Sequence, residues 1–409
     1  MKRVVVTGMS TITSLGNDWG TFVSHVDAGR TGVIRMPEWD SYQHLTTRLA
    51  APLRDFVMPP QFTRKHTRSM GRVSMLAVAA TEQALANAGL LNHPDLQTGL
   101  AGVAYGSCVG AIEDIGRFGQ AVLDPVSKSL DANSFLRMMP HTTAVNIGVH
   151  YGLKGRVLPT SSACTSGSQG VGFAYEAIKW GKQNLMLAGG AEEICVADAM
   201  VFDTLYAAST KNDSPQLTPR PFDAMRDGLV VGEGAGTLVL EEYEHAKTRG
   251  ATIHAEIIGF GSNSDGTHVT RPQTETMEGA MRLALEDAGL SATGSGIGYV
   301  NLHGTATEQG DIAESQATHR LFGASMPAST AKGHLGHTLG ACGAIEAWLT
   351  IEMMNRDTYL PTANLTQVDE RCGALDYVMG SRRAMSVDLA MSNNFAFGGI
   401  NTSLIFRRV

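Results

Sequence analysis

The stretch SSACTSGS at residues 161–168 places one cysteine among small side chains, and the chain becomes helical by Phe173. A thiol at the N-terminus of a helix feels the positive end of the helix dipole, which lowers its pKa and favours the thiolate. The small neighbours leave room for a substrate to approach Cys164. A buried structural cysteine has the same surroundings, so this stretch indicates a nucleophile without establishing one.

Outward from Cys164, short apolar runs that end in glycine alternate with helical segments along the whole chain. This alternation predicts an α/β protein with mainly buried sheets. A second series begins near residue 251, so we expect two halves, residues 1–250 and 251–409, that pack as one body. Two such halves suit a duplicated fold, although no repeat is obvious at the level of single residues. The expected strands are residues 4–6, 100–105, 185–188, 253–260 and 298–302, and the expected helices are residues 74–88, 173–180, 276–288 and 339–355.

The composition argues against several classes of protein. The 409 residues carry a formal net charge of −7 and no basic tail, unlike a nucleic-acid binder. No apolar run approaches the roughly 18 residues of a membrane-spanning helix. The cysteines are widely spaced and form no C-x-x-C pair, so we expect neither a disulfide framework nor a zinc site, and a reducing cytoplasm fits best. These cysteines are Cys108, Cys164, Cys195, Cys342 and Cys372.

Two histidines lie in segments that are typical of active-site loops. His303 opens HGTATEQGD (residues 303–311) directly after an expected strand, where functional groups often lie. His337 ends KGHLGH (residues 332–337), which begins with Lys332, and it opens the expected helix that carries Glu346. A histidine at a helix N-terminus is biased towards the neutral form. Either histidine could instead be satisfied by its own turn, and no recognisable ligand spacing surrounds them, so we expect no metal.

A last segment, NNFAFGGIN at residues 393–401, sets two aromatic side chains beside paired glycines. Glycine adopts backbone conformations that other residues avoid, so Phe397 followed by Gly398 and Gly399 is typical of a turn that moves. A static structural turn would have the same composition.

Together these segments supply a nucleophile, two histidines, a lysine and an aromatic loop, in an order that resembles the β-ketoacyl-[acyl-carrier-protein] synthases of fatty-acid and polyketide synthesis, closest to the type I/II elongating enzymes. The resemblance runs from Val4 to Phe406. Further matching blocks are RPFD at residues 220–223, RDG at 226–228 and GEGAG at 232–236. It implies a thiolase-like α/β fold, in which two similar halves stack as five alternating layers of helix and sheet.

The resemblance also implies a role for each site residue. Cys164 accepts the acyl group, His303 and His337 complete a Cys-His-His set, and Lys332 lies beside them. Glu346 and Asp311 support these residues without touching the substrate. Phe397, with Gly398 and Gly399, gates the acyl pocket, and the backbone N–H groups of Cys164 and Phe397 form an oxyanion hole. The residues implied to touch the phosphopantetheine arm are Thr270, Thr305 and Thr307.

The implied reaction is a decarboxylative Claisen condensation of malonyl-[acyl-carrier-protein] with an acyl thioester on Cys164. The enzyme would need no cofactor, because phosphopantetheine arrives on the acyl-carrier protein, and it would form a homodimer or a heterodimer with a chain-length factor. Departures from the common pattern leave the substrate open between housekeeping fatty-acid synthesis and a specialised pathway such as aryl polyene assembly. These departures are Ala306, Glu308, Ile400 and the segment 333–335 between Lys332 and His337.

Other readings stay open. A thiolase, acting on coenzyme A esters, would need a second cysteine as base, for which Cys342 is the nearest candidate. A non-catalytic chain-length factor would lack the nucleophile, which this chain retains at Cys164. Cysteine hydrolysis of the papain type is more remote, because the two histidines lie in separate turns.

Carrier proteins are acidic, and so is this chain, so we expect a local basic patch to bind the carrier. Several basic residues cluster in one short stretch, and two others are expected near the same entrance. An ordinary solvated helix face would have the same pattern. The residues are Arg64, Lys65, Arg68 and Arg72, with Lys128 and Lys211.

Overall fold

Two five-strand units with the same order and direction of pairing form the core of the computed structural model, which describes residues 1–409. Neighbouring strands pair as antiparallel, antiparallel, parallel and parallel in both units. The first unit runs β1 (Val4–Ile12), β8 (Gly234–Glu242), β6 (Leu185–Glu192), β4 (Ala101–Gly106) and β5 (Val157–Thr160). The second runs β9 (Ala255–Ser264), β16 (Ile400–Arg407), β15 (Leu389–Ala396), β10 (Tyr299–Asn301) and β11 (Pro327–Ser329), with β13 (Asp376–Tyr377) beyond. The duplicated α/β fold is therefore confirmed, while the boundary at residue 250 stays a prediction.

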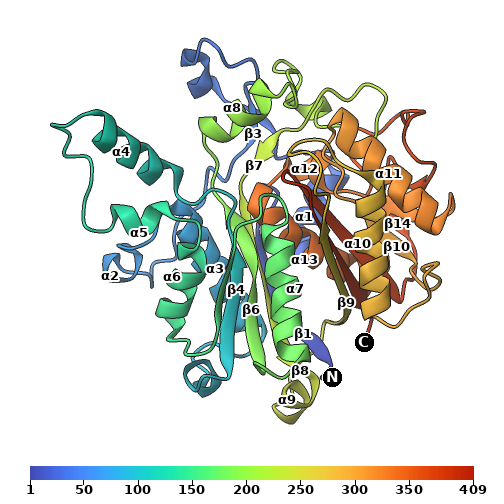
Figure 1. Cartoon of the computed structure of the whole chain (residues 1–409), viewed down its shortest axis with the longest axis horizontal. Helices are drawn as coiled ribbons and strands as arrows, with labels where there is room; N and C mark the ends of the chain where they lie inside the picture. Colours follow the sequence, from blue (N-terminus) through green and yellow to red (C-terminus); the bar gives the residue numbers. More distant parts are fainter.

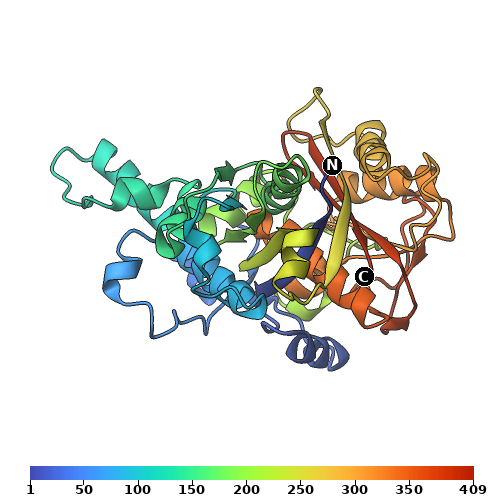
Figure 2. The ribbon, with the colours of Figure 1, turned by 90° about the horizontal axis from the view of Figure 1, so that it is seen from below.

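Strands β1 and β9 join the two units, because Val4–Val6 pairs with residues 255–257. Helices α7 (Ser166–Lys179) and α13 (Cys342–Asn355) pack on each other between strands of both units. The outer layers are α3 (Arg72–Asn87) with α6 (Thr142–Tyr151) on one side, and α10 (Thr274–Asp287) with α11 (Glu308–Phe322) on the other. The result is the expected stack of five layers, seen from two directions in Figures 1 and 2.

Glycine allows the two middle helices to cross closely. A Cβ on Gly167 would lie 2.9 Å from the Gly340 oxygen, and a Cβ on Gly343 would lie 2.5 Å from the Ser168 nitrogen. No other residue fits at either position without moving the opposite helix. The N-termini of α7 and α13 therefore meet at one point in the interior.

The duplication also has a trace in the sequence that pattern reading missed. Residues 84–90 (ALANAGL) and 284–290 (ALEDAGL) end α3 and α10, and they lie at equivalent places in the two units. A Cβ on Gly8 of β1 would lie 2.4 Å from the Ala84 oxygen, and a Cβ on Gly259 of β9 would lie 2.3 Å from the Ala284 oxygen. Each unit thus packs its first strand against an outer helix through the same glycine contact.

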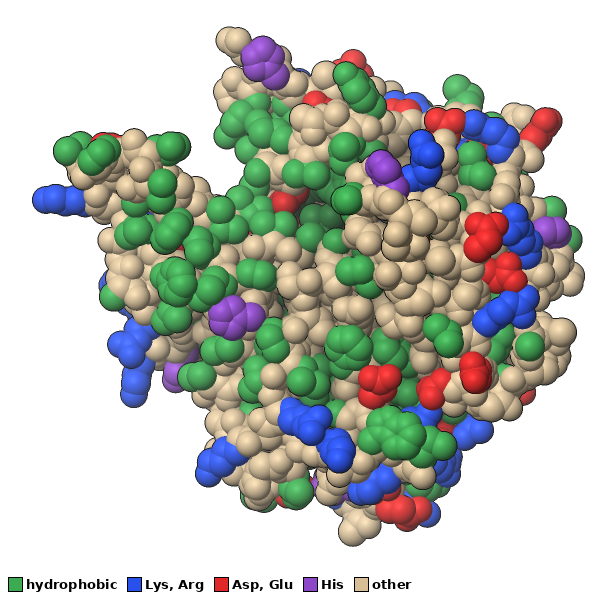
Figure 3. All heavy atoms as spheres, in the orientation of Figure 1, with side chains coloured by type: hydrophobic (Ala, Val, Ile, Leu, Met, Phe, Trp, Pro, Cys, Tyr) green, Lys and Arg blue, Asp and Glu red, His purple; other side chains and the backbone are tan.

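The remaining elements surround this core. Helices α4 (Ile112–Leu123) and α5 (Ser134–Met138) project from one side of the body, and hydrophobic side chains lie exposed on this projection (Figures 1 and 3). None of the helices is both long and apolar enough to cross a membrane. The other helices and short 3-10 turns are α1 (Trp19–Asp27), α2 (Arg64–Thr67), α8 (Val196–Thr204), α9 (Tyr243–Thr248), α12 (Lys332–Leu335), η1 (Pro37–Ser41), η2 (Pro94–Gln97), η3 (Pro215–Leu217) and η4 (Leu339–Ala341). The short strands are β2 (Ile34–Arg35), β3 (Leu49–Ala51) and β7 (Val231–Gly232), which form one sheet, and β12 (Thr358–Tyr359) with β14 (Arg383–Ala384).

Candidate active site

Cys164 lies in the turn between β5 and α7, two residues before the helix begins at Ser166. Its neighbour Ala163 has a φ of 52°, in the left-handed region that non-glycine residues rarely adopt. Ser166 holds this turn, because its Oγ donates to the Ala163 carbonyl at 2.7 Å and accepts from the Ser162 N–H at 2.9 Å. Strain held by the surrounding structure is typical of functional turns, and here it presents Cys164 to a cavity.

His337 faces the Cys164 thiol. Its Nε2 lies 3.0 Å from the Cys164 Sγ, and its Nδ1 accepts a hydrogen bond from the Leu339 N–H at 3.2 Å. A neutral imidazole that accepts at Nδ1 carries its proton on Nε2. His337 is therefore a hydrogen-bond donor towards the sulfur.

His303 is held in the same tautomer by different contacts. Its Nδ1 lies 3.1 Å from the Lys332 Nζ, a group that can only donate. The proton is therefore on Nε2, which is buried and has no partner in the protein. The ring centroids of His303 and His337 are 5.2 Å apart. The Nε2–H of His303 is therefore an unpaired hydrogen-bond donor, and it lies beside His337, whose Nε2–H faces the Cys164 thiol.

Lys332 and Glu346 form a buried ion pair behind the histidines. Lys332, at the start of α12, also donates to the His303 carbonyl at 2.6 Å, while Glu346 extends from α13. Burial alone would lower the pKa of Lys332, but the Glu346 carboxylate more than offsets it and the pKa lies above its usual value. Lys332 is therefore charged, and its charge lies against His303.

This arrangement keeps both histidines neutral. Burial and then the nearby Lys332 charge lower the pKa of His303 and of His337 well below the usual 6.5. The sequence predicted a neutral His337 from a position at a helix N-terminus, and that reason was wrong. The 3-10 turn η4 separates His337 from α13, so burial and Lys332 are the cause.

The thiol itself is not activated at rest. Burial raises the pKa of Cys164 to about 11, against the lowering effects of Lys332 and of the Phe397 and Cys164 backbone N–H groups. The sequence predicted a lowered pKa from the helix dipole, and that expectation was wrong because burial of Cys164 outweighs it. Both N–H groups that were expected to form an oxyanion hole nevertheless approach the sulfur.

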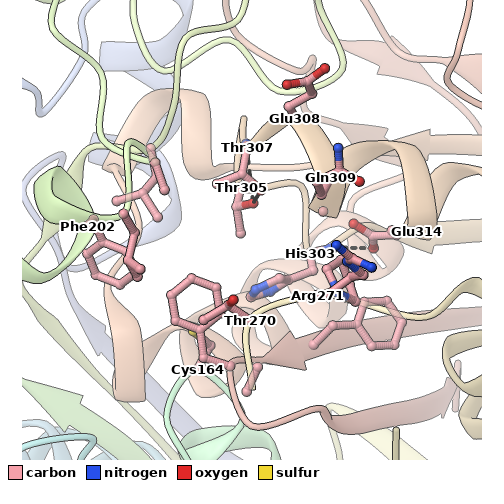
Figure 4. A pocket seen from close by; sticks show the side chains of 18 of the residues that line it. Cys164, Phe202, Thr270, Arg271, His303, Thr305, Thr307, Glu308, Gln309 and Glu314 are labelled. Carbon is pink, nitrogen blue, oxygen red and sulfur yellow. Dashed lines mark hydrogen bonds between the residues drawn. The ribbon is translucent and has the colours of Figure 1, made fainter. Parts of the chain in front are cut away.

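The cavity at Cys164 has a volume of about 400 Å³. Besides Cys164, His303 and His337, it is lined by the expected threonines Thr270, Thr305 and Thr307 and by Phe397 and Gly399 (Figure 4). Thr305 and Thr307 lie with their hydroxyl oxygens 2.9 Å apart. The cavity is therefore lined with hydroxyl groups on the way to the thiol, and Gly398 lies outside this lining.

Asp311 supports the loop that carries His303 by accepting hydrogen bonds from the backbone, and it does not line the cavity. It accepts from the Phe222 N–H at 2.6 Å and from the Ala306 N–H at 3.1 Å, and burial raises its pKa to about 6. Glu314, which sequence reasoning missed, does the same for His303 itself, whose N–H it accepts at 2.5 Å. Glu314 lies three residues after Asp311 on the same helix face, and that spacing was the available signal.

Phe397 lies in the turn between β15 and β16, where Gly398 and Gly399 have φ angles of 88° and 70°. Its ring packs against Phe202 of α8, with the centroids 5.6 Å apart. Phe202 was not singled out from the sequence, because an aromatic residue within an apolar helix has no local signal of function. Phe397, the expected gate residue, thus rests on a second aromatic ring that also lines the cavity.

The expected docking residues differ in whether they already have a partner in the protein. Arg64, Lys65 and Arg68, on or next to α2, are exposed and unpaired, as is Lys128 after α4, and none lines the cavity. Lys211 donates to Asp227 at 3.2 Å beside the cavity, and Arg72 is paired with Glu233. The first four residues remain available to a partner, whereas Lys211 and Arg72 already have one.

Two sets of side chains group donor atoms within 4.8 Å of one another, as a metal site would. One set is Cys164, His303 and His337, and the other is His303, Cys342 and Glu346. Lys332 donates to His303 and Glu346 of the second set, so an ammonium group already provides the positive charge there. Cys342 itself donates to the Cys164 carbonyl and does not line the cavity.

Comparison with known proteins identifies the family. The family models for the N-terminal and C-terminal domains of β-ketoacyl synthases match residues 1–246 and 254–366. The chain is 37% identical to a 3-oxoacyl-[acyl-carrier-protein] synthase 2 of Vibrio cholerae, over all of this chain and 99% of that protein. A crystal structure of a β-ketoacyl synthase from Burkholderia phymatum is 62% identical with a TM-score of 0.98, and both chains are covered completely.

A more distant solved structure is the ishigamide ketosynthase/chain length factor, which is 29% identical with a TM-score of 0.89, over all of this chain and 99% of that one. With the family models and the full-length relatives, this match confirms the resemblance inferred from the sequence and the thiolase-like fold that it implied. The chain belongs to the β-ketoacyl synthase family.

Proposed function

We propose that this β-ketoacyl synthase, an acyltransferase, condenses an acyl group held on Cys164 with malonyl-[acyl-carrier-protein] to give 3-oxoacyl-[acyl-carrier-protein]. The observation that carries the proposal is the convergence of the Cys164 thiol and two neutral histidines, each with its proton on Nε2, at one cavity. Enzymes of this family use no free cofactor, since the carrier protein supplies the phosphopantetheine.

In the first half-reaction, the Cys164 sulfur attacks the acyl thioester on the carrier. The S–C bond to the carrier breaks, and the Cys164 proton ends on the departing thiol. Because the pKa of Cys164 is about 11 at rest, the thiolate must form as the substrate binds. The His337 Nε2–H and the Phe397 and Cys164 N–H groups support this developing negative charge.

In the second half-reaction, malonyl thioester loses carbon dioxide and leaves an enolate. The free His303 Nε2–H and the His337 Nε2–H are the donors for the enolate oxygen. The enolate carbon then attacks the acyl carbonyl, the bond to Cys164 breaks, and the released thiolate takes up a proton. Neutral histidines suit this step, because they donate without giving up their proton.

The two alternative activities have less support. A thiolase base would have to face the substrate, and Cys342 instead donates to the Cys164 carbonyl outside the cavity. Burial also raises the pKa of Cys342 well above its usual value. A non-catalytic chain-length factor has no need of the nucleophile and both histidines, all of which are present and in contact.

The acyl-carrier protein is the proposed partner, bound through Arg64, Lys65, Arg68 and Lys128, and Lys211 contributes only after releasing Asp227. We also propose a dimer, either with a second copy or with a chain-length factor. Strand β5 ends its sheet with no neighbour on its outer side, and the projection formed by α4 and α5 carries exposed hydrophobic residues. Unpaired edges and apolar patches of this kind are typical of interfaces.

The remaining proposals concern the setting of the enzyme. The five cysteines are free, which supports the reducing cytoplasm. Glu308, one of the departures from the common pattern, lines the cavity and pairs with Arg371. We propose fatty-acid or polyketide synthesis, including aryl polyene assembly, as the pathway, with no metal ion required and the two halves meeting at residue 250.

The test is a condensation assay with acyl-loaded carrier protein, with and without malonyl-loaded carrier protein. Mass spectrometry should find the acyl group on Cys164 without malonyl carrier, and 3-oxoacyl carrier with carbon dioxide when malonyl carrier is added. Product formation from two acetyl-coenzyme A molecules, without malonyl carrier, would instead indicate a thiolase. The chain length of the acyl groups trapped on Cys164 would identify the pathway.

A further inference from the structure

Asn394 of β15 touches the catalytic set but has no part in the chemistry described above. It is 1% exposed, its Nδ2 donates to the Glu346 Oε2 at 2.6 Å, and the same nitrogen lies 3.3 Å from the His303 Nδ1. We infer that Asn394 is a positioning residue that keeps Glu346 ionised beside Lys332, and thereby holds His303 as an Nε2–H donor. This inference rests on the proposed function for its effect on turnover.

The orientation of the Asn394 amide supports the inference. Its Oδ1 is buried without a hydrogen-bond partner, a state that costs free energy. Turning the amide by half a turn would place that oxygen against the Glu346 carboxylate and the His303 Nδ1 lone pair, where both contacts repel. The observed orientation therefore leaves an acceptor unused in order to donate to Glu346.

Glu346 depends on two donors for its charge. Lys332 binds Oε1 and Asn394 binds Oε2. Burial raises the pKa of Glu346, and the Lys332 charge and the two hydrogen bonds act against that rise. Without Asn394, Glu346 would take up a proton more readily, Lys332 would lose its counter-charge, and the Lys332 contact with His303 Nδ1 would weaken.

Other titratable groups also face this cluster, from every element packed against it. The titratable groups that face Glu346 and Lys332 are Cys342 of α13, Glu314 of α11, Tyr299 of β10, His303 after β10, and Cys164 and His337 at the cavity. Both histidines stay neutral and the thiols stay protonated near neutral pH, whereas burial raises the pKa of Glu314 to about 8, so Glu314 titrates in the parent and in the variants alike. Asn394 donates to Glu346 and not to Glu314, so Glu346 is the carboxyl group whose charge the Asn394 amide can decide.

Replacing Asn394 by aspartate provides a test with a distinctive pH dependence. The introduced carboxyl group and Glu346 would share one proton. The aspartic acid can donate a hydrogen bond to the Glu346 Oε2 only while the aspartic acid itself holds that proton. We therefore expect malonyl-carrier decarboxylation by Asn394→Asp to rise as the pH falls from 8 to 6. Asn394→Ala should be slower than the parent by about tenfold to about a hundredfold, the usual effect of losing a hydrogen bond to a charged group, and the loss should be largest at low pH, where Glu346 in the variant takes up its proton.

The matched control is Asn393→Asp, the neighbouring residue on the same strand, which contacts Met281 and Ser403 instead of the network. It introduces the same buried carboxyl group and should not acquire the rise at low pH. Circular dichroism and thermal melting establish that each variant folds. Asn394→Ser, whose hydroxyl can still donate to Glu346, should fall between Asn394→Ala and the parent, and it serves if Asn394→Ala is unstable.

A second measurement separates this inference from the proposed function. Infrared spectra of protein with carbon-13-labelled glutamate, compared with Glu346→Gln, report whether Glu346 is ionised regardless of turnover. The Glu346 carboxylate band should persist to lower pH in the parent than in Asn394→Ala. If the carboxylate band persists over the same pH range in the two proteins, the inference is overturned. If the band differs between them as expected but the parent does not decarboxylate malonyl carrier, the proposed function alone is overturned.

Discussion

The Cys342 thiol donates to the backbone carbonyl of Cys164, with 3.2 Å between sulfur and oxygen, while the Cys164 thiol faces His337 on the other side. One buried cysteine thus supports the backbone of another. Only Cys164 has its sulfur at the cavity, so the two thiols should behave differently towards substrate.

Cys164→Ala should abolish condensation and leave the melting temperature nearly unchanged. Incubation of the parent with acyl-carrier protein should load Cys164 and no other cysteine, as peptide mass spectrometry can determine. Cys342→Ala is the control, since it removes a contact to the backbone and should retain loading at Cys164. An acyl group found on Cys342 or on Cys108 would contradict the assignment.

His303→Ala and His337→Ala should each slow malonyl decarboxylation by about 10²–10³, the usual effect of removing one donor to a developing oxyanion. Transfer of the acyl group to Cys164 should suffer less, most clearly for His303, whose Nε2 makes no hydrogen bond to the sulfur. Release of carbon dioxide from malonyl carrier protein measures the first effect. If either variant releases it at the parental rate, that histidine is not a donor.

His334 predicts a pH dependence of stability. Burial lowers its pKa below 6.5, and its Nε2 lies 2.9 Å from the Pro361 carbonyl, away from the cavity. Below pH 6.5 the unfolded chain binds a proton that the folded chain does not, so this residue makes the fold less stable as the pH falls. Relative to His334→Gln, the parent should lose up to about 1.4 kcal/mol per pH unit below 6.5. Denaturant unfolding at pH 7.5, 6.5 and 5.5 measures the difference, and a constant difference would contradict the prediction.

A moving Phe397 gate requires freedom in the two glycines after it. A Cβ on Gly399 would lie 2.7 Å from the Asp265 Cβ, whereas a Cβ on Gly398 would meet open space. Gly398→Ala therefore stiffens the left-handed turn without that clash, and Gly399→Ala adds the clash to the same stiffening. Both should slow acyl transfer or condensation more than their melting temperatures explain. Normal turnover by Gly398→Ala would leave Phe397 as a static wall.

The exposed basic residues near α2 predict how the carrier binds. Exchanging Lys65 and Arg68 for Glu should raise the Michaelis constant for carrier-bound substrate, most strongly at low ionic strength, where charge interactions are least screened. Exchanging both Lys182 and Lys247 for Glu makes the same change in charge outside this patch, at two other exposed lysines, and should have no effect. An unchanged constant at low salt would remove this patch from the interface.

The sequence predicted the family, the duplicated α/β fold and the cavity residues, because motifs such as HGTATEQGD and SSACTSGS keep their chemistry in a short stretch. It could not predict contacts that depend on distant segments. Asn394 and Glu346 are 48 residues apart, and Phe202 meets Phe397 only in the folded chain. The protonation state of the Cys164 thiol could not be predicted either, because burial decides it and burial is a property of the whole fold.

The close crossing at Gly167 and Gly343 has an electrostatic consequence. It brings the positive ends of two helix dipoles, one from each half of the chain, to the same buried point, where Lys332 adds a full charge. These positive ends favour a negative charge, and they act against the burial that keeps the Cys164 thiol protonated at rest. Each half of the chain contributes one of these two helix ends, so neither half alone provides the electrostatic surroundings of the thiolate and the enolate through which the reaction passes.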